Sequence, residues 1–241
     1  MPDSDLPSDV DQPLRRLVAE AADFVQQNPR EAASGTWWWP RPADRLQNVL
    51  PEPTTIRHAA VLVLLWEHDD GPRLLLTERS AAMAKHPGQI SFPGGAAEEF
   101  DLDTTGTALR EAQEEVGLDP VRVEVIGPLP PALVPVSGFS VTPVLAAAED
   151  VGVLTPYSGE VARLIHAPVA DLITPEHRYM AVIEREGIRS STPAFYFGEG
   201  TDDAAFVWGF TGILLDRMLD RLGWAQQWDE ARVLDPRQFK R

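Results

Sequence analysis

One stretch, Gly94 to Leu118, constrains the fold of this chain more than any other. It reads GGAAEEFDLDTTGTALREAQEEVGL, which predicts a glycine turn, an acidic loop and then a helix. We expect Thr104 or Thr105 to cap the start of that helix, because short hydroxyl side chains accept hydrogen bonds from its first free amides. We expect Gly117 to end the helix, because glycine adopts the left-handed backbone that commonly follows the last turn.

The expected helix carries three carboxylates on one side. Residues three and four apart are neighbours on a helix, so Glu111, Glu114 and Glu115 share a face, and Arg110 can pair with Glu114. Like charges at this spacing repel by a few tenths of a kcal/mol per pair, and the helix dipole disfavours anions in the last turn by about 0.3–1 kcal/mol each. A bound divalent cation would remove the conflict, whereas the alternative interpretation is a solvated acidic face.

Six residues of the stretch follow a known pattern: Gly95, Arg110, Glu111, Glu114, Glu115 and Gly117. They resemble the Nudix box, the glycine-to-REuxEExGu signature of Nudix hydrolases. The interval from Gly95 to Arg110 is fifteen positions, one longer than the general pattern, so Asp101 and Asp103 flank the usual acidic midpoint. The coenzyme A pyrophosphatase branch of the family has the same extra residue.

A second motif runs directly into the box. The segment LLLTERSAAMAKHPGQISFPGG, Leu74 to Gly95, resembles the LLTxRS…HxGQxxFPGG pattern of that branch. The resemblance continues through LPP, SGF and VTPV between Leu129 and Val144, and through VWGFTG from Val207 to Gly212. It covers roughly Ala59 to Gly223. It implies an α/β fold, the Nudix-type α/β/α sandwich with a mixed β-sheet, and the interleaved strands and helices of the chain agree with this.

The resemblance also implies roles for the residues of the box. Glu111 and Glu115 would bind Mg²⁺ or Mn²⁺, and Glu114 would be a third metal ligand or the general base. The backbone carbonyl of Gly95 would be another ligand, since glycine allows close approach. Arg110 would orient the glutamates, so the expected catalytic residues are Arg110, Glu111 and Glu114.

Further candidates lie outside the box. Glu160, at the start of a late strand, is a candidate metal ligand, with Glu98 as the alternative, although each could be an ordinary surface glutamate. The upstream motif supplies four candidate substrate contacts: Arg79, His86, Gln89 and Ser91. The guanidinium of Arg79 could bind a substrate phosphate or pair with the acidic box.

The charge of the chain limits its partners. A formal net charge of −16 argues against nucleic-acid and anionic-membrane surfaces. The absence of cysteine excludes disulfides and thiolate chemistry. The N-terminus lacks a signal-peptide pattern and no apolar run reaches the length of a membrane span, so a cytoplasmic protein is expected. Cations such as Arg79 and Lys85 are scarce, so an anionic substrate would depend on metal ions.

Periodicity divides the rest of the chain. We expect a disordered tail at 1–12, a helical extension and linker at 13–57, a hydrolase domain at 58–225 and a C-terminal tail at 226–241. The expected helices are Leu14 to Gln27 and Ala205 to Leu222. The expected strands are Ala59 to Trp66, Arg73 to Glu78, Val121 to Ile126, Val141 to Ala148 and Val161 to Ala167, with a late hairpin of Arg178 to Ile183 and Pro193 to Phe197.

Three consecutive tryptophans, Trp37, Trp38 and Trp39, are unusual in this chain. They predict a segment packed on the core or a subunit interface, which leaves a homodimer open. A stacking wall for adenine or pantetheine is the other interpretation.

The leading functional hypothesis is a metal-dependent hydrolase of coenzyme A and acyl-coenzyme A. Cleavage of the diphosphate would give 3′,5′-ADP and (acyl-)4′-phosphopantetheine. Hydrolysis of another nucleoside diphosphate derivative, such as NADH or ADP-ribose, is the alternative within enzymes. A non-catalytic Nudix binding domain is the alternative from another class, and the presence of all three box glutamates argues against it.

Overall fold

The computed structural model describes residues 10–39, 56–83, 86–134, 137–185, 188–201 and 204–239. These residues fall into two compact units. The box unit combines residues 10–65 with 93–155 and carries the acidic helix, while the second unit combines residues 66–92 with 156–241. Residues 43–55 of the expected linker, most of the expected N-terminal tail and Lys85 lie outside the described residues, while Arg57, at the end of that linker, begins a strand.

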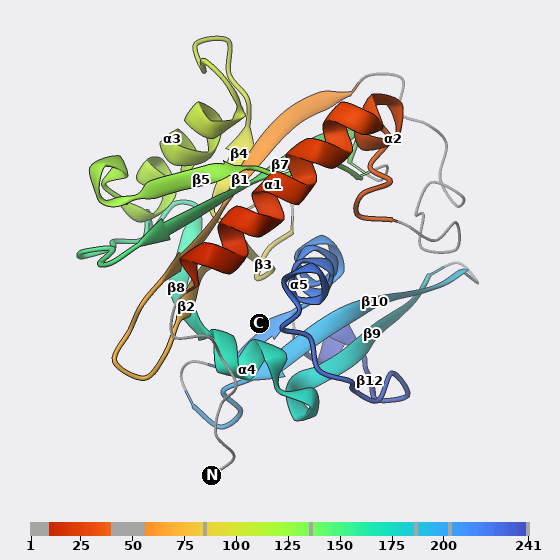
Figure 1. Cartoon of the computed structure of the whole chain (residues 1–241). Coiled ribbons are helices and arrows are strands. Elements are labelled where there is room, and N and C mark those ends of the chain that lie inside the picture. Colours follow the sequence, from red (N-terminus) through yellow and green to blue (C-terminus); the bar gives the residue numbers. More distant parts are fainter. Residues whose placement is uncertain are drawn as a thin grey trace. The chain divides into compact units, whose positions relative to one another are not determined.

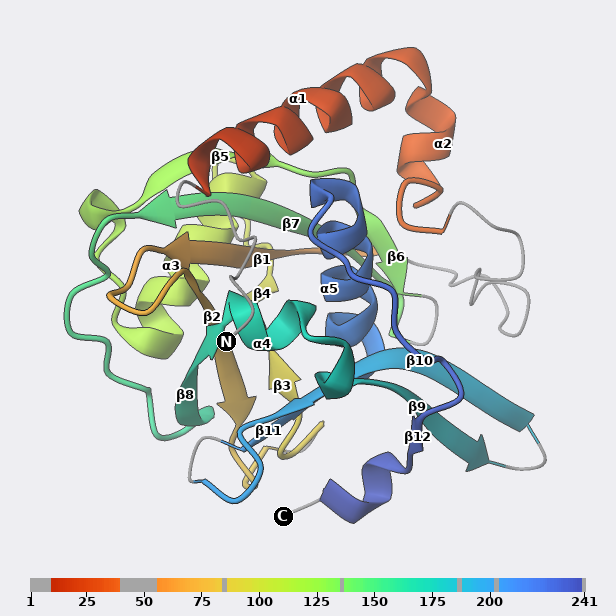
Figure 2. The ribbon, with the colours of Figure 1, turned by 60° about the horizontal axis from the view of Figure 1, so that its bottom comes forward.

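The box unit is built on a mixed sheet. Its strands are β1 (Arg57–Trp66), β4 (Gly94–Ala96), β5 (Glu124–Pro128), β6 (Ala132–Val134) and β7 (Phe139–Ala148). β4 pairs antiparallel with β1, and β5 and β6 pair antiparallel with β7. β1 lies next to β7, and the two run in the same direction (Figure 2). β1 is almost entirely buried, as its continuous apolar run predicts.

Helices cover the two faces of this sheet (Figure 1). They are α1 (Asp11–Gln27), which continues into the short α2 (Pro29–Ala33), and α3 (Thr104–Val116). α1 contacts β5 and β7 on one face, and α3 contacts β4, β5 and β7 on the other. Gly127 of β5 has a φ of +152°, and a Cβ there would lie 2.7 Å from a methyl group of Val18. Glycine therefore lets α1 sit directly on the strand, and the predicted helix–sheet–helix layering is confirmed for this unit.

The second unit contains two groups of strands. β2 (Arg73–Arg79) pairs antiparallel with β3 (Ile90–Ser91) and with β8 (Val161–Pro168). A four-stranded sheet has the order β11 (Ala205–Val207), β10 (Ile188–Phe197), β9 (Arg178–Arg185) and β12 (Val233–Leu234). Only the β12–β9 pair of this sheet is parallel. The helices α4 (Val169–Ile173) and α5 (Gly209–Leu222) contact β10.

Two expected elements differ from the structure. Residues 205–207 form β11 rather than the first turn of a helix, because the apolar triplet pairs with Phe195, Tyr196 and Phe197 of β10. The helix begins at Gly209, whose amide bonds to Thr192 Oγ1 at 3.2 Å. The expected strand from Val121 starts instead with a 3₁₀ turn at Pro120–Arg122, because proline begins the turn and Asp119 caps it.

The chain ends also differ from expectation. Asp11 and Gln12 of the expected tail are already helical, and a second helix, α2, begins at Pro29, since the missing amide of proline costs nothing at the first position of a helix. The expected C-terminal tail includes β12 and a 3₁₀ helix, Pro236–Phe239. No helix in the described part of the chain is both long and apolar enough to cross a membrane.

The three tryptophans lie in the core of the box unit. Trp37, Trp38 and Trp39 are each less than 5% exposed. The indole nitrogen of Trp38 donates to the carbonyl of Pro130 at 2.6 Å, and the ring of Trp37 packs 5.0 Å from that of Phe24. The interpretation as a segment packed on the core is therefore confirmed, and the burial of all three rings leaves no open stacking wall.

Candidate active site

The acidic helix α3 is fixed at both ends by its own sequence. Asp103 is the N-cap, and its Oδ1 accepts from the amide of Gly106 at 2.8 Å. The expectation of Thr104 or Thr105 at this position is wrong by one residue, since the carboxylate caps at least as well as a hydroxyl. Gly117 ends the helix with a φ of 69°, as predicted. These ends place the glutamates in the last two turns.

Two of the glutamates contact the glycine turn that precedes the helix. A Cβ on Gly95 would lie 2.5 Å from Oε2 of Glu111, so only glycine leaves room for that carboxylate. Glu115 is buried, and its Oε2 accepts from the amide of Gly94 at 3.1 Å. Gly94 itself has a φ of +154°, and a Cβ there would lie 2.4 Å from the carbonyl oxygen of Ala60. The motif therefore needs both glycines, and for different reasons.

Arg110 connects two of the glutamates, Glu111 and Glu114, to the rest of the loop. Its Nη1 donates to Oε1 of Glu111 at 2.8 Å and to Oε2 of Glu114 at 3.2 Å. Its Nη2 also donates to the carbonyl of Ala96 at 3.1 Å. The predicted pair with Glu114 is confirmed, and the contact with Glu111 agrees with an orienting role for the arginine.

Asp101 is the site residue that sequence reasoning missed. Its two oxygens accept from Nε and Nη2 of Arg110, each at 2.9 Å, and one also accepts from the amide of Glu98 and the hydroxyl of Thr107, each at 2.9 Å. These donors hold the pKa of Asp101 well below its usual range, with Arg110 as the largest cause, and the same pairing raises the pKa of Arg110. Two carboxylate oxygens match the fork of one guanidinium, which was the available signal.

The extra residue of the loop explains how Asp101 reaches this position. Leu102, between the two aspartates, is 99% exposed, so the loop accommodates its extra residue by placing Leu102 in solvent. Asp101 then faces Arg110 and Asp103 caps the helix. The side chain of Phe100 lies on the same loop, with its ring 5.5 Å from the guanidinium carbon of Arg110.

The donor set of the box suits a hard divalent cation. Glu111 and Glu115 both lie against the Gly94–Gly95 turn, and carboxylate and carbonyl oxygens are the ligands that Mg²⁺ and Mn²⁺ prefer. Glu114 is the most exposed of the three, with 60% of its side chain accessible. Within the ranges that the structure describes, no three acidic or histidine side chains are gathered into a ready-made metal cluster.

The two candidates for an additional acid are both exposed. Glu98 belongs to the box unit, where its backbone amide donates to Oδ2 of Asp101 at 2.9 Å. Glu160 belongs to the second unit, where its carbonyl accepts from the amide of Ser80 at 2.7 Å. A metal-binding role for either stays a prediction.

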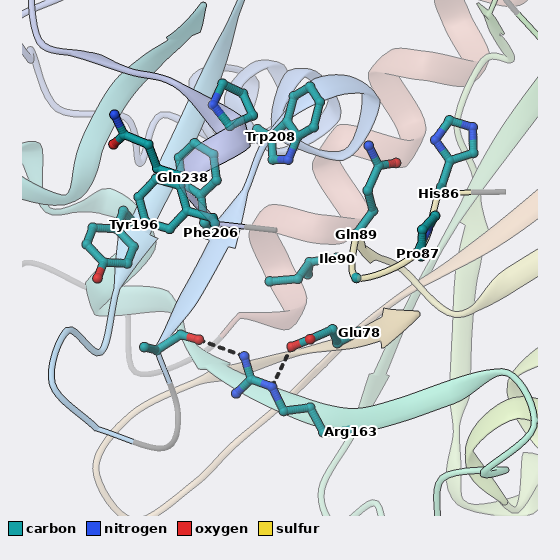
Figure 3. Close-up of a pocket in the computed structure, with 14 residues that line it drawn as sticks. Glu78, His86, Pro87, Gln89, Ile90, Arg163, Tyr196, Phe206, Trp208 and Gln238 are labelled. Carbon is teal, nitrogen blue, oxygen red and sulfur yellow. Dashed lines mark hydrogen bonds and ion pairs between the residues drawn. The ribbon is translucent and has the colours of Figure 1, made fainter. Parts of the chain in front are cut away.

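The motif upstream of the box forms part of a pocket in the second unit (Figure 3). The pocket has a volume of about 440 Å³. It is lined by Glu78, His86, Pro87, Gly88, Gln89, Ile90, Arg163, Tyr196, Ala204, Phe206, Trp208, Pro236, Gln238 and Phe239. Two of the predicted substrate contacts, His86 and Gln89, are therefore among its walls.

The other two motif residues have different surroundings. The backbone of Arg79 brackets the loop, because its amide donates to the carbonyl of Gln89 at 2.9 Å and its carbonyl accepts from Gly88 at 3.0 Å. The Arg79 side chain makes no ion pair with any residue that the structure describes. Ser91 pairs with Thr77, and their hydroxyl oxygens are 3.4 Å apart. A substrate contact by Arg79 or Ser91 stays a prediction.

Comparison with known proteins identifies the family. The family model described as the NUDIX domain matches residues 56–185, more than half of the chain. The chain belongs to the Nudix family. It is a hydrolase of the pyrophosphatase class, and Nudix hydrolases generally use divalent metal cations.

Similar Nudix proteins occur in bacteria and plants. The chain is 42% identical over 162 residues to an uncharacterized Nudix hydrolase NudL from Pectobacterium atrosepticum, across 67% of this chain and 81% of the relative. It is 40% identical over 164 residues to the mitochondrial Nudix hydrolase 15 of Arabidopsis thaliana, across 66% of this chain and 56% of that protein. A crystal structure of a Nudix hydrolase from M. smegmatis, RenU, has a TM-score of 0.40 and 24% identity, across 46% of this chain and 70% of that one.

Proposed function

We propose that this Nudix hydrolase cleaves the diphosphate of coenzyme A and acyl-coenzyme A. The products would be 3′,5′-ADP and 4′-phosphopantetheine or its acyl derivative. The observation that supports this substrate class is the pocket formed by the motif upstream of the box, in which His86, Gln89 and Ile90 stand a few positions before the Gly94–Gly95 turn.

Hydrolysis of a diphosphate requires that its negative charge be neutralised and that one water be positioned and deprotonated. Divalent cations supply the neutralisation and lower the pKa of a bound water. Glu111, Glu115 and the carbonyl of Gly95 would hold them, because these groups meet at one glycine turn. Glu114 takes the proton of the attacking water in this proposal, because its carboxylate is the most accessible of the three.

The remaining residues of the box position these carboxylates. Arg110 bonds to Glu111 and Glu114, and Asp101 fixes the arginine from the opposite side of its guanidinium. The water oxygen forms a bond to one phosphorus while the bridging P–O bond breaks, and the two products leave as phosphate monoesters. No covalent intermediate with the protein is needed.

A product analysis tests the proposal. The full chain is incubated with Mg²⁺ or Mn²⁺ and coenzyme A, acetyl-coenzyme A, NADH or ADP-ribose, and the products are identified by mass spectrometry. The expected result is 3′,5′-ADP with 4′-phosphopantetheine or its acyl form, at a higher kcat/KM than for NADH or ADP-ribose. Faster cleavage of NADH or ADP-ribose would assign the enzyme to that alternative, and no cleavage of any of the four would contradict the proposal.

A further inference from the structure

We propose that the pocket of the second unit binds an adenine ring, which stacks on an aromatic wall and presents its polar edge to Gln89. The ring would belong to the adenosine half of the nucleotide substrate, and to that extent the inference rests on the proposed function. Adenine binding itself depends only on residues that line the pocket, so it can be measured without catalysis.

The aromatic wall comes from three segments that are distant in sequence. Tyr196 of β10, Phe206 of β11 and Phe239 of the C-terminal 3₁₀ helix form one cluster. Phe206 and Phe239 are stacked with their centroids 4.1 Å apart, and Tyr196 lies 4.9 Å from Phe239. Trp208 adds an indole near this cluster (Figure 3). Phe206 is itself buried, so the partly buried rings of Tyr196, Phe239 and Trp208 form the surface on which a planar ligand can stack, since every nucleobase has a π-face.

The opposite wall of the pocket is the loop at 86–90, and backbone hydrogen bonds hold this loop in a defined conformation. The amide of Gln89 donates to the carbonyl of His86 at 3.2 Å, and two further backbone bonds join Gly88 and Gln89 to Arg79. His86 has a φ of 56°, and no other non-glycine residue in the described ranges has a positive φ. A non-glycine residue keeps a positive φ only where the surrounding structure holds it in that conformation. The loop is therefore set before a ligand arrives.

Gln89 supplies a recognition group from that loop. Its side chain is half-buried, it lies between Trp208 and His86 in Figure 3, and it makes no hydrogen bond to any side chain or backbone group that the structure describes. A carboxamide offers one acceptor and two donors side by side. This pattern matches the N6 amino group and the N7 acceptor of adenine, with which glutamine forms a two-point contact.

The charges of the pocket select against other parts of a nucleotide. Arg163 donates to Oε2 of Glu78 at 2.6 Å and to the carbonyl of Ala204 at 2.6 Å, so its charge is compensated where it faces the pocket (Figure 3). A phosphate would lie close to the Glu78 carboxylate and be repelled. An acyl chain would remove water from the Arg163–Glu78 ion pair. It would also remove water from the carboxamides of two lining glutamines without replacing their hydrogen bonds; these are Gln89 and Gln238. An uncharged heterocycle with a polar edge fits both constraints.

Calorimetric titration of AMP and IMP, without metal, tests the inference. AMP carries the N6 amino group that IMP lacks, and neither has a diphosphate. We expect the unmodified chain to bind AMP at least about fivefold more tightly than IMP, as one two-point base contact predicts. Gln89→Leu should bring the ratio close to one. Phe239→Leu should weaken both ligands alike, because it removes stacking and leaves the edge contact.

Two further variants keep the test decisive. Gln227→Leu changes an exposed glutamine of the same unit outside the pocket and should leave both affinities unchanged. Gln89→Glu retains the size of the side chain, so it replaces the leucine variant if circular dichroism shows that the latter does not fold. An AMP-to-IMP ratio unaffected at Gln89, or an AMP affinity unaffected at Phe239, would overturn the inference.

The same variants separate this inference from the proposed function. If Phe239→Leu weakens 4′-phosphopantetheine but not AMP, the pocket belongs to the other half of coenzyme A and adenine is the wrong occupant. Cleavage of coenzyme A together with unchanged AMP binding would retain the proposed function and reject the adenine pocket. The expected AMP and IMP pattern without cleavage of coenzyme A would retain the pocket and reject the proposed function.

Discussion

Asp101 and Arg110 form a two-point ion pair, in which Nε and Nη2 of the arginine each lie 2.9 Å from a different carboxylate oxygen. The pair leaves Nη1 of Arg110 directed at Glu111 and Glu114. One edge of the guanidinium therefore pairs with Asp101, and the remaining nitrogen bonds to the two box glutamates. The loop residue expelled into solvent, Leu102, is what allows this arrangement in a box with one extra position.

Asp101→Asn should lower kcat/KM by roughly ten- to a hundredfold, the usual effect of removing a partner that orients a metal ligand. Asparagine keeps one acceptor oxygen, but it replaces the other with an NH2 donor and loses the charge, so the two-point pair that fixes Arg110 would be lost. Asp103→Asn is the matched control, because asparagine caps a helix as well as aspartate does. Steady-state kinetics of both variants checks this, and equal losses would contradict a specific role for Asp101.

The ion pair between Asp101 and Arg110 should make the free energy of unfolding depend on pH. The pKa of Asp101 is lower in the folded protein than in the unfolded chain, where it is about 3.9. Its contribution to stability is therefore complete above that value and is lost as the pH falls through the folded pKa. Urea unfolding of wild type and Asp101→Asn should show a constant difference from pH 7 to about pH 5 and a shrinking one below about pH 4. A difference that already shrinks at pH 6 would implicate another group.

Gly95→Ala should abolish most activity while leaving the fold intact. The added methyl would collide with the carboxylate of Glu111, which is the end of a flexible side chain and can move away. Gly106→Ala in the same helix is the control, since its nearest neighbour is 3.7 Å away, and it should stabilise the protein by up to about 1 kcal/mol. Thermal unfolding and kcat of the two variants distinguish a displaced ligand from a damaged fold.

Glu115→Gln should remove metal-dependent stabilisation as well as activity. In wild type, saturating Mg²⁺ or Mn²⁺ should raise the melting temperature and a chelator should reverse this, because a ligand of the folded state stabilises it. Glutamine retains an acceptor for the Gly94 amide but loses the charge, so the metal-free melting temperature should change little. Glu99→Gln, in the exposed part of the loop, is the control. A Glu115→Gln protein that still gains stability from the metal would place the site elsewhere.

Asp216→Asn should destabilise the protein by about 3–5 kcal/mol, the range found when one member of a buried ion pair is removed. Asp216 bonds to Arg178, which is 1% exposed and whose guanidinium carbon lies 4.4 Å from the ring centre of Phe195 and 4.9 Å from that of Trp228. Burial lowers the pKa of Arg178 and raises that of Asp216, so each charge depends on the other. Asp220→Asn, exposed on the same helix, should cost less than about 0.5 kcal/mol. Urea denaturation measures both.

The sequence by itself determined the parts of this protein that depend on neighbouring residues. The box helix, its end at Gly117 and the pairing of Arg110 with Glu114 follow from helical periodicity and from interactions within one turn. The buried strand β1 likewise follows from a local feature, its continuous apolar run. The requirement for glycine at 95 could also be anticipated, because close backbone approach permits no side chain.

Only the tertiary structure decided the contacts between segments far apart in the chain. Residues 205–207 continue a helical pattern in sequence, yet they form a strand because β10 offers them a pairing edge. The partner of Arg110 depends on which loop residue is expelled into solvent, and no local rule selects Leu102. The pocket joins the loop at 86–90 with Arg163, β10, β11 and the last 3₁₀ helix. Such assembly follows from burying side chains of the whole chain together, which sequence periodicity does not encode.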